Sequence, residues 1–204
     1  MNRLNILIAE DESLTRMDLR EMLEHAGHLV CAEANNGVKA VDLAKRFAPD
    51  LAILDIKMPG LDGIEVAKIM HSMNIPAIML TAYSQQNFIN RAEKVYVYGY
   101  LVKPVTERDL LPTVQIAFAR WAEMQLIQSE LRKTRQQLDS QKTIAHAKSI
   151  VSAKKGLNAL ESHQVLIRMA MDARMPLVEM AQQLIASSGS DTVQTDIKKT
   201  VDEF

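Results

Sequence analysis

The chain has 204 residues, of which 48% are hydrophobic and 24% are charged, and its formal net charge is −1. This length allows one large domain or two small ones, and the hydrophobic content is sufficient for a real core. A single cysteine, Cys31, excludes a disulfide framework and suits a reducing cytosol. The sequence shows no signal peptide and no apolar run of membrane-spanning length, so we expect a cytoplasmic protein that does not bind membranes.

Charge is distributed unevenly along the chain. Residues 1–110 contain 12 Lys/Arg and 15 Asp/Glu, a net of −3, whereas residues 141–186 contain 6 and 3, a net of +3. An acidic front half and a basic back half indicate separate tasks, and a polyanion would suit the back half as a partner. The alternative is a basic surface that is merely solvated.

The front half alternates between short apolar runs and amphipathic segments. We expect strands at 4–9, 28–34, 51–54, 76–80 and 98–102. We expect helices at 13–26, with Ser13 as the cap, at 38–47, 63–73 and 84–94, and from Thr106 onward. Five strands that alternate with five helices predict right-handed crossovers and a parallel sheet covered on both faces.

Polar side chains follow the ends of four of these strands: Glu10, Asp11, Asp55, Thr81 and Lys103. Parallel strands bring their carboxyl ends to one edge, so these side chains should converge there. Three carboxylates repel one another unless a cation lies among them, and an all-oxygen set suits Mg²⁺. The lysine and the threonine would neutralise a phosphoryl group carried by Asp55, a carboxylate nucleophile. Taken singly, each residue could instead be a helix cap, a strand end or a solvated charge.

Four motifs support this interpretation: LIAEDE at 7–12, DIKMPGLDG at 55–63, LTA at 80–82 and YLVKP at 100–104. With them, residues 3–118 resemble the receiver domain of two-component response regulators. The resemblance implies a flavodoxin-like α/β fold with a five-stranded parallel sheet of order 2-1-3-4-5. We place the receiver domain at 1–112.

The same resemblance implies roles for the converging residues. Asp55 is the phosphoacceptor for a sensor histidine kinase. Glu10, Asp11 and Asp55 hold Mg²⁺ with the backbone carbonyl of Lys57. The first acidic position is Glu10 where the family more often has Asp, which lengthens the side chain but keeps its charge. The domain is expected to be no enzyme beyond accepting a phosphoryl group and hydrolysing it slowly.

Further roles follow for the last two strands. Lys103 contacts the phosphoryl group, and Thr81 with Tyr100 forms the switch pair: Thr81 moves toward the phosphate and Tyr100 turns inward. The peptide between Lys103 and Pro104 is expected to be cis. The tyrosines at 96, 98 and 100 alternate, so on a strand they would share one face. That row would be a docking patch or ordinary edge packing.

A long helix should follow the receiver domain, because Gly is absent from Leu110 to Gly156. One heptad position reads Leu, Ala, Met, Leu, Leu, Ala, while the other turns polar at Gln128, Arg135 and Lys142. The pattern predicts a coiled-coil linker at 113–145 that forms a weak parallel dimer when the protein is phosphorylated. The alternative is a helix that packs on its own receiver domain and ends in a charged tip.

Three short helices are expected in the back half, from Thr143 to Lys155, from Leu160 to Asp172 and from Pro176 to Ala186, with a flexible tail at 187–204. Residues 147–185 resemble the ANTAR domain, the RNA-binding module of AmiR/NasR-type transcription antitermination regulators. The matching residues are Ala147-Lys148, Gly156-Leu157, Ala170-Met171-Asp172, Pro176-Leu177 and Ala181, Leu184 and Ile185. We place this domain at 146–186.

RNA hairpins would be the partner of this module, through bases splayed from a loop. His163 would stack on a base, although the family often has an aromatic residue at its position and Ala at that of Ser162. The expected phosphate or base contacts are Lys148, Lys154, Lys155, Arg168 and Arg174. The sequence thus predicts a phosphorylation-controlled, RNA-binding antitermination regulator. A protein–protein signalling adaptor is the alternative, and a DNA-binding regulator is less favoured because no recognition face is evident.

Overall fold

The computed structural model describes residues 3–82 and 97–188 of the chain. The chain divides into two compact units, Met1–Leu126 and Ile127–Phe204. The helix expected at 84–94, the residue Tyr96 and the tail beyond 188 lie outside the described residues. No helix within the described ranges is both long enough and apolar enough to cross a membrane.

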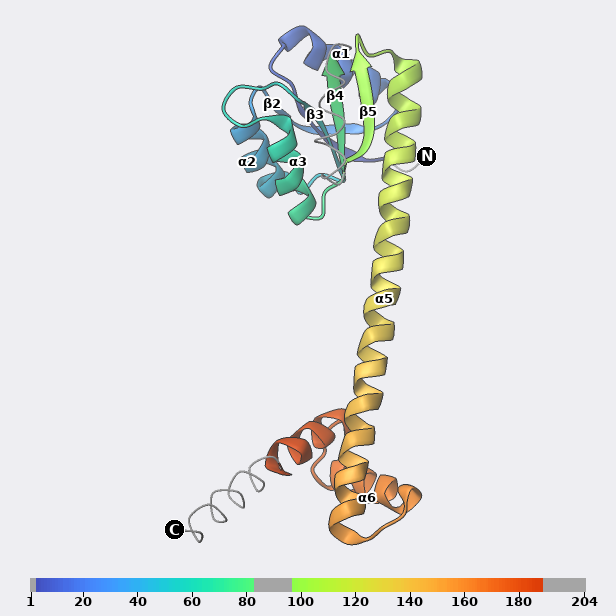
Figure 1. Cartoon of the computed structure of the whole chain (residues 1–204). Coiled ribbons are helices and arrows are strands. Elements are labelled where there is room, and N and C mark those ends of the chain that lie inside the picture. Colours follow the sequence, from blue (N-terminus) through green and yellow to red (C-terminus); the bar gives the residue numbers. More distant parts are fainter. Residues whose placement is uncertain (1–2, 83–96, 189–204) are drawn as a thin grey trace, which may run out of the picture. The chain divides into compact units, whose positions relative to one another are not determined.

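The first unit contains a five-stranded parallel sheet in the order β2-β1-β3-β4-β5 (Figure 1). This order confirms the predicted flavodoxin-like fold. Four of the five strands end next to a polar residue that the sequence singled out. The strands are β1 (Asn5–Ala9), β2 (Leu29–Ala34), β3 (Leu51–Asp55), β4 (Ala77–Ala82) and β5 (Val97–Lys103).

Helices cover both faces of this sheet (Figure 1). Helix α1 (Ser13–His25) and the start of α5 (Glu107–Lys155) pack on one face, and α2 (Gly37–Phe47) and α3 (Gly63–Ser72) pack on the other. Strand β3 is buried along its whole length because its residues face one of these two cores on each side. The sheet therefore forms a rigid support whose carboxyl edge carries the polar residues.

Two local predictions were wrong. Ser13 does not cap α1: the capping position is Glu12, whose side chain makes no capping hydrogen bond to the helix backbone. The tyrosines of β5 do not form a continuous row either. The register between β4 and β5 shifts after Ala77, which pairs with Val97, so that Ile78 pairs with Gly99. This bulge lets Tyr98 pack against the core under α1 and α5, whereas Tyr100 is 39% exposed.

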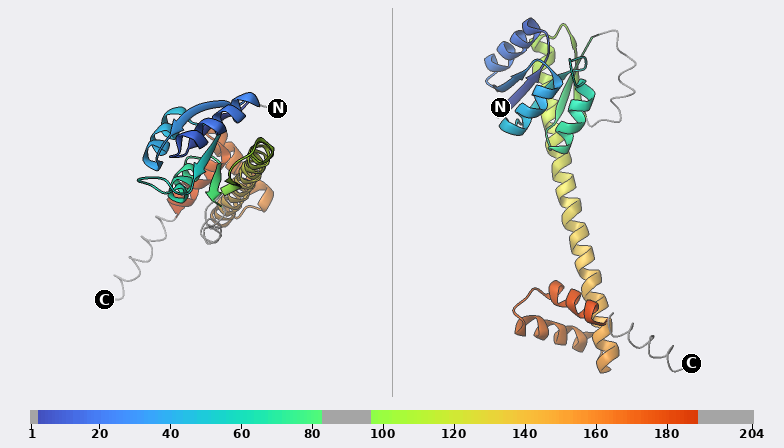
Figure 2. Two further views of the ribbon diagram at one scale, coloured as in Figure 1. Left: turned by 90° about the horizontal axis from the view of Figure 1, so that it is seen from above. Right: turned by 90° about the vertical axis from the view of Figure 1, so that its left-hand side faces the viewer.

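The second unit consists of the continuation of α5, helix α6 (Ala159–Asp172) and a helix at 177–188 (Figure 2). Asn158 caps α6 in a reciprocal capping box with Glu161. A small core joins the three helices, with Ala147 of α5, Leu166 and Ala170 of α6, and Met180 and Ala181 of the last helix. Helix α5 continues without interruption past residues 145 and 146, so the domain boundary placed there stays a prediction.

Candidate functional site

The site lies at the carboxyl edge of the sheet. Glu10 directly follows β1, Asp55 is the last residue of β3, Thr81 lies near the end of β4, and Lys103 is the last residue of β5. Because these strands are neighbours in a parallel sheet, their ends meet at one edge. The structure thus brings together the residues that the strand pattern predicted to converge.

Lys103 links two of the carboxylates. Its ammonium nitrogen lies 2.6 Å from Oε2 of Glu10 and 3.2 Å from Oδ1 of Asp55. Glu10 is fully buried and the side chain of Asp55 is only 10% exposed. A buried carboxylate without a compensating charge would cost several kcal/mol. Lys103 therefore supplies the positive charge that keeps two buried anions at this edge.

Burial determines the ionisation of the two buried acids. The pKa of Asp55 is raised above its ordinary value by burial, against the opposing effect of the Lys103 ammonium. The pKa of Glu10 is also raised by burial, partly offset by Lys103 and reinforced by the nearby Asp55. Burial alone would lower the pKa of Lys103, but Glu10 and Asp55 together outweigh it and raise that pKa. The site thus holds more negative charge than it can easily accommodate.

These carboxylates fit a hard divalent cation. Glu10, Asp11 and Asp55 each offer an oxygen, and the three ligand atoms lie within 4.8 Å of one another. An all-oxygen set with one exposed member, Asp11, leaves room for the waters that Mg²⁺ retains. Lys57, in the loop after β3, is exposed, and the role of its backbone carbonyl stays a prediction.

The loop after Asp55 depends on a close backbone approach. A Cβ atom on Gly63 would overlap the carbonyl oxygen of Asp55, and the Gly63 amide donates a hydrogen bond of 2.9 Å to the carbonyl of Ile56. Asp62 caps α3 by accepting a hydrogen bond of 2.8 Å from the amide of Glu65. Gly63 therefore lets the start of α3 lie directly against the backbone that presents the Asp55 carboxylate.

The predicted switch residues lie on the last two strands. The Thr81 hydroxyl donates a 3.2 Å hydrogen bond to the carbonyl of Ala82. Tyr100 is partly exposed, and the peptide between Lys103 and Pro104 is cis, as the resemblance implied. The coupled movement of Thr81 and Tyr100 stays a prediction.

One contributor to this edge escaped the sequence analysis. Arg16, in the first turn of α1, donates a 2.6 Å hydrogen bond to the carbonyl of Glu10 and lies 3.3 Å from Glu33 of β2. The signal in the sequence is its position. A cation in the first turn of a helix opposes the helix dipole, and the first turn of α1 contains no acidic residue.

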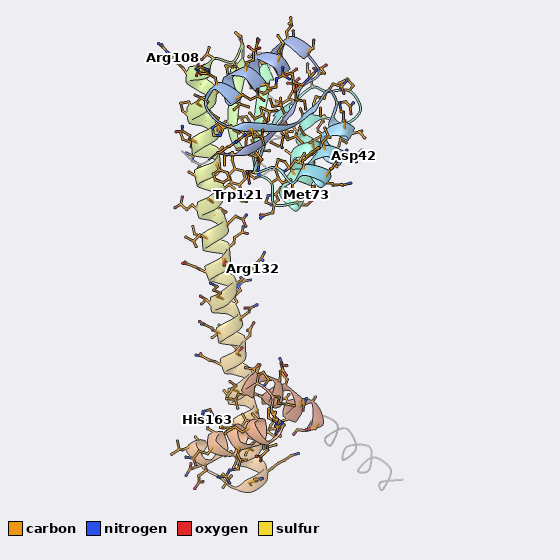
Figure 3. All side chains as sticks on the ribbon, turned by 180° about the vertical axis from the view of Figure 1, so that it is seen from behind. Asp42, Met73, Arg108, Trp121, Arg132 and His163 are labelled. Carbon is orange, nitrogen blue, oxygen red and sulfur yellow. The ribbon has the colours of Figure 1, made fainter. Side chains whose placement is uncertain are left out.

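The second unit carries the residues predicted to contact RNA. Lys154, Lys155, Arg168 and Arg174 are exposed, whereas Lys148 is half-buried. His163 is half-buried on α6, where Figure 3 labels it, and its Nδ1 atom is buried with no hydrogen-bond partner among the described residues. Their shared role in RNA binding stays a prediction.

Helix α6 has a second apolar side besides the one that faces the core. Leu160, Ile167 and Met171 are exposed, and their spacing places them on one side of the helix. A shallow groove of about 380 Å³ adjoins this side, lined by Ile167, Met171, Arg174 and neighbouring residues up to Leu177. The unit therefore presents an apolar surface next to an exposed guanidinium group.

Two family models match the chain. Residues 6–115 match the response regulator receiver domain, and residues 132–185 match the ANTAR domain. One match lies within each compact unit of the structure.

Some known proteins are similar to nearly the whole chain, and others are similar to its first part alone. The transcriptional regulatory protein PdtaR of Mycobacterium tuberculosis is 37% identical over 186 residues, which is 91% of each chain. The chemotaxis protein CheY of Bacillus subtilis is 38% identical over 111 residues, 53% of this chain and 92% of CheY. The signal receiver domain of a modulated diguanylate cyclase from Desulfovibrio desulfuricans G20 is 33% identical, with a TM-score of 0.57 over 60% of this chain and 99% of that one.

Proposed function

Because the chain belongs to the response regulators that join a receiver domain to an ANTAR domain, we propose that it is a phosphorylation-controlled regulator that binds RNA hairpins in transcription antitermination. The observation that carries the receiver part is the ion-paired edge, where Lys103 bridges Glu10 and Asp55 with Asp11 beside them. A solvent-exposed carboxylate with no binding role would not need a lysine and two further acidic residues beside it.

In the proposed reaction, a carboxylate oxygen of Asp55 attacks the phosphorus of a phosphohistidine on a sensor kinase. The O–P bond forms as the P–N bond breaks, and the leaving imidazole takes up a proton. Mg²⁺ held by Glu10, Asp11 and Asp55 would supply charge neutralisation and orientation of the phosphoryl oxygens. Lys103 then exchanges its ion pair with Asp55 for one with the phosphoryl group. The chain itself is a phosphoryl acceptor that hydrolyses the product slowly.

Treatment with acetyl phosphate and Mg²⁺ tests this step. We expect one acyl phosphate per chain, detected by intact mass, and none in Asp55→Asn. Asp62→Asn is the matched control, because it lies in the same loop and an Asn can still cap α3. Equal modification of Asp55→Asn and the unaltered chain would place the phosphoacceptor elsewhere.

Phosphorylation is proposed to act through dimerisation along α5. The heptad residues Leu110 and Ala117 are buried against the receiver sheet, but Met124, Leu131 and Leu138 at the same heptad position are 45–53% exposed. Large apolar side chains repeated every seven residues favour a coiled-coil partner. A second copy of the chain satisfies that pattern symmetrically.

The RNA part rests on the surface of the second unit. Exposed Ile167 and Met171 offer apolar area for unstacked bases, and Arg168 and Arg174 offer charge for phosphates. A protein partner would suit the same apolar side, and a DNA-binding output is the weakest alternative. Cross-linking the phosphorylated protein in cells and sequencing the recovered RNA separates them. Recovery of a protein partner without hairpin RNA would favour the adaptor function.

A further inference from the structure

We propose that Arg16 is a positioning residue for the metal site, held by Glu33 so that it fixes the backbone from which Glu10 and Asp11 project. The inference rests on the Mg²⁺ site of the proposed function and assigns it a supporting arrangement from α1 and β2. It concerns the backbone beneath the carboxylates, because Arg16 bonds to carbonyl oxygens there.

Arg16 reaches both residues of the acidic turn. One terminal nitrogen, Nη1, lies 2.6 Å from the carbonyl oxygen of Glu10 and 3.5 Å from that of Asp11. The first is a short charge-assisted hydrogen bond and the second is at the outer limit of one. Arg16 thus holds the chain that carries the acidic residues without using any of the carboxylate oxygens that would bind the cation.

Glu33 holds the other side of the guanidinium. Its Oε2 lies 3.3 Å from Nε of Arg16, and its Oε1 lies 3.0 Å from Nη1 of Arg20. The side chain of Arg16 is 19% exposed, compared with 40% for Arg20. A planar guanidinium with partners on two edges has little freedom to rotate away, so the turn after β1 is braced against β2.

The position of Arg16 opposes local helix chemistry. It lies in the first turn of α1, where the helix dipole disfavours a cation, and the turn itself contains no acidic residue, although Glu12 precedes it at the capping position. A local rule broken without compensation within the helix commonly marks a functional site. Here the compensation comes from Glu33 of the neighbouring strand and from two carbonyls of the acidic turn.

Residues that orient metal ligands typically change metal affinity by about 10- to 100-fold when they are removed. We expect Arg16→Gln to weaken Mg²⁺ binding by about tenfold, at the low end because Asp11 is exposed. The measurement is calorimetric titration of the full chain with Mg²⁺ at constant ionic strength. The Mg²⁺ concentration for half-maximal phosphorylation by acetyl phosphate should rise by the same factor, with the rate at saturating Mg²⁺ retained.

Arg20→Gln is the matched control. This variant removes the same charge and the other ion pair of Glu33, but the Arg20 guanidinium bonds to Glu33 and not to the carbonyls of the acidic turn, so the variant's Mg²⁺ affinity should stay within about twofold. Equal weakening by both variants would show a general charge effect and overturn the proposal, as would unchanged affinity of Arg16→Gln. If the chain as it stands binds no Mg²⁺, the proposed metal site fails instead.

Glu33→Ala provides a second test that leaves Arg16 in place. As a single change, it should weaken Mg²⁺ binding severalfold. Added to Arg16→Gln, it should have no further effect, because Glu33 acts on the metal site only through Arg16. Additive effects of the two changes would contradict the proposal. Thermal unfolding without Mg²⁺ distinguishes loss of the fold from loss of positioning, and it keeps Glu33→Ala informative if Arg16→Gln unfolds.

Discussion

The buried position of Asp55 disfavours the charged form of its carboxyl group. Burial raises its pKa and that of Glu10, so the folded state binds these protons more tightly than the unfolded state does. Stability from this source is present at low pH and is lost as pH rises through the raised folded values. At neutral pH the two buried carboxylates therefore contribute against folding, Lys103 offsets part of that contribution, and a bound divalent cation would offset more of it.

Replacing Asp55 with Asn should consequently raise the metal-free melting temperature at pH 7, by about 2–4 °C for each 1 kcal/mol of the cost of burying the charge that the change removes. Lys103 keeps Glu10 as a partner in this variant. The difference from the unaltered chain should shrink as pH falls toward the ordinary carboxyl range. Mg²⁺ should stabilise the unaltered chain more than the variant. Circular dichroism melts across pH, with and without Mg²⁺, measure both effects, and a variant that melts lower at pH 7 would contradict the argument.

Gly63 gives a second prediction for a single residue. A Cβ atom there would overlap the Asp55 carbonyl oxygen, so Gly63→Ala must push α3 away from β3. We expect a loss of about 1–3 kcal/mol of unfolding free energy and slower phosphorylation of Asp55. Gly27→Ala is the control for losing a glycine without a steric overlap. Nothing lies near the Cβ position of Gly27, so that change strains only the backbone, through its positive φ of 88°. Urea unfolding with phosphorylation rates measures both quantities, and only Gly63→Ala should slow phosphorylation.

The sequence revealed those residues that share one signal, a polar type at a strand end: Glu10, Asp55, Thr81 and Lys103. It marked Gly63 only as the last residue of the DIKMPGLDG motif and could not show why glycine is needed there, because the atom that a Cβ would strike belongs to a different element. Arg16 was missed for a related reason. Its partners are backbone carbonyls and Glu33 of β2, and its place in the first turn of a helix, the one signal in the sequence, does not identify those partners.

Among the elements, helix periodicity predicted better than strand alternation did. The apolar spacing predicted the long helix α5. At one heptad position of this helix, the first residues are buried against the sheet and the later ones are exposed. Strand alternation failed in β5, because a bulge at Tyr98 changes which side chains share a face. A bulge is set by pairing with the neighbouring strand, which the sequence of β5 alone does not record.

The exposed heptad residues of α5 give a prediction for that element. Leu131→Asp should weaken dimerisation of the phosphorylated protein by at least about tenfold, because each copy would bury a charge in place of a leucine worth about 1.5–3 kcal/mol. Ser129→Asp adds the same charge to the opposite side of the helix, where residue 129 is exposed, and should dimerise normally. Sedimentation velocity with and without phosphorylation measures the difference. Equal behaviour of the two variants would exclude this side of α5 as the interface.

A change at Arg174, in the turn after α6, tests the proposed RNA binding without disturbing the fold. Arg174 has a φ of 54°, in the left-handed region that favours Gly, and its side chain adjoins the groove beside Met171. Arg174→Gly should therefore leave the melting temperature unchanged or raise it, yet weaken hairpin RNA binding. The slope of log affinity against log salt should fall by about one if the guanidinium contacts a phosphate. Arg174→Lys keeps the charge and should retain most of the slope. If Arg174→Gly weakens RNA binding but leaves the salt slope unchanged, Arg174 does not contact a phosphate and has another role.

In the whole molecule, two compact units share one continuous helix, and each carries half of the proposed function. The first unit holds the carboxylate edge, and the second holds the apolar and basic surface of α6. The sequence predicted this division from its charge asymmetry and from two separate resemblances. If phosphorylation of the first unit controls RNA binding by the second, we expect α5, the helix that both units share, to carry the effect.

If dimerisation is the link, phosphorylation should raise affinity for a two-hairpin RNA by about 10²-fold or more, because the second contact becomes intramolecular, while affinity for a single hairpin changes little. Leu131→Asp should still accept the phosphoryl group but lose the gain, and Asp55→Asn should lose both. Fluorescence anisotropy with one- and two-hairpin RNAs, at protein concentrations above and below the dimer dissociation constant, measures these effects. An equal gain for single hairpins, retained in Leu131→Asp, would show instead that the receiver restrains the RNA-binding unit of its own chain and releases it on phosphorylation.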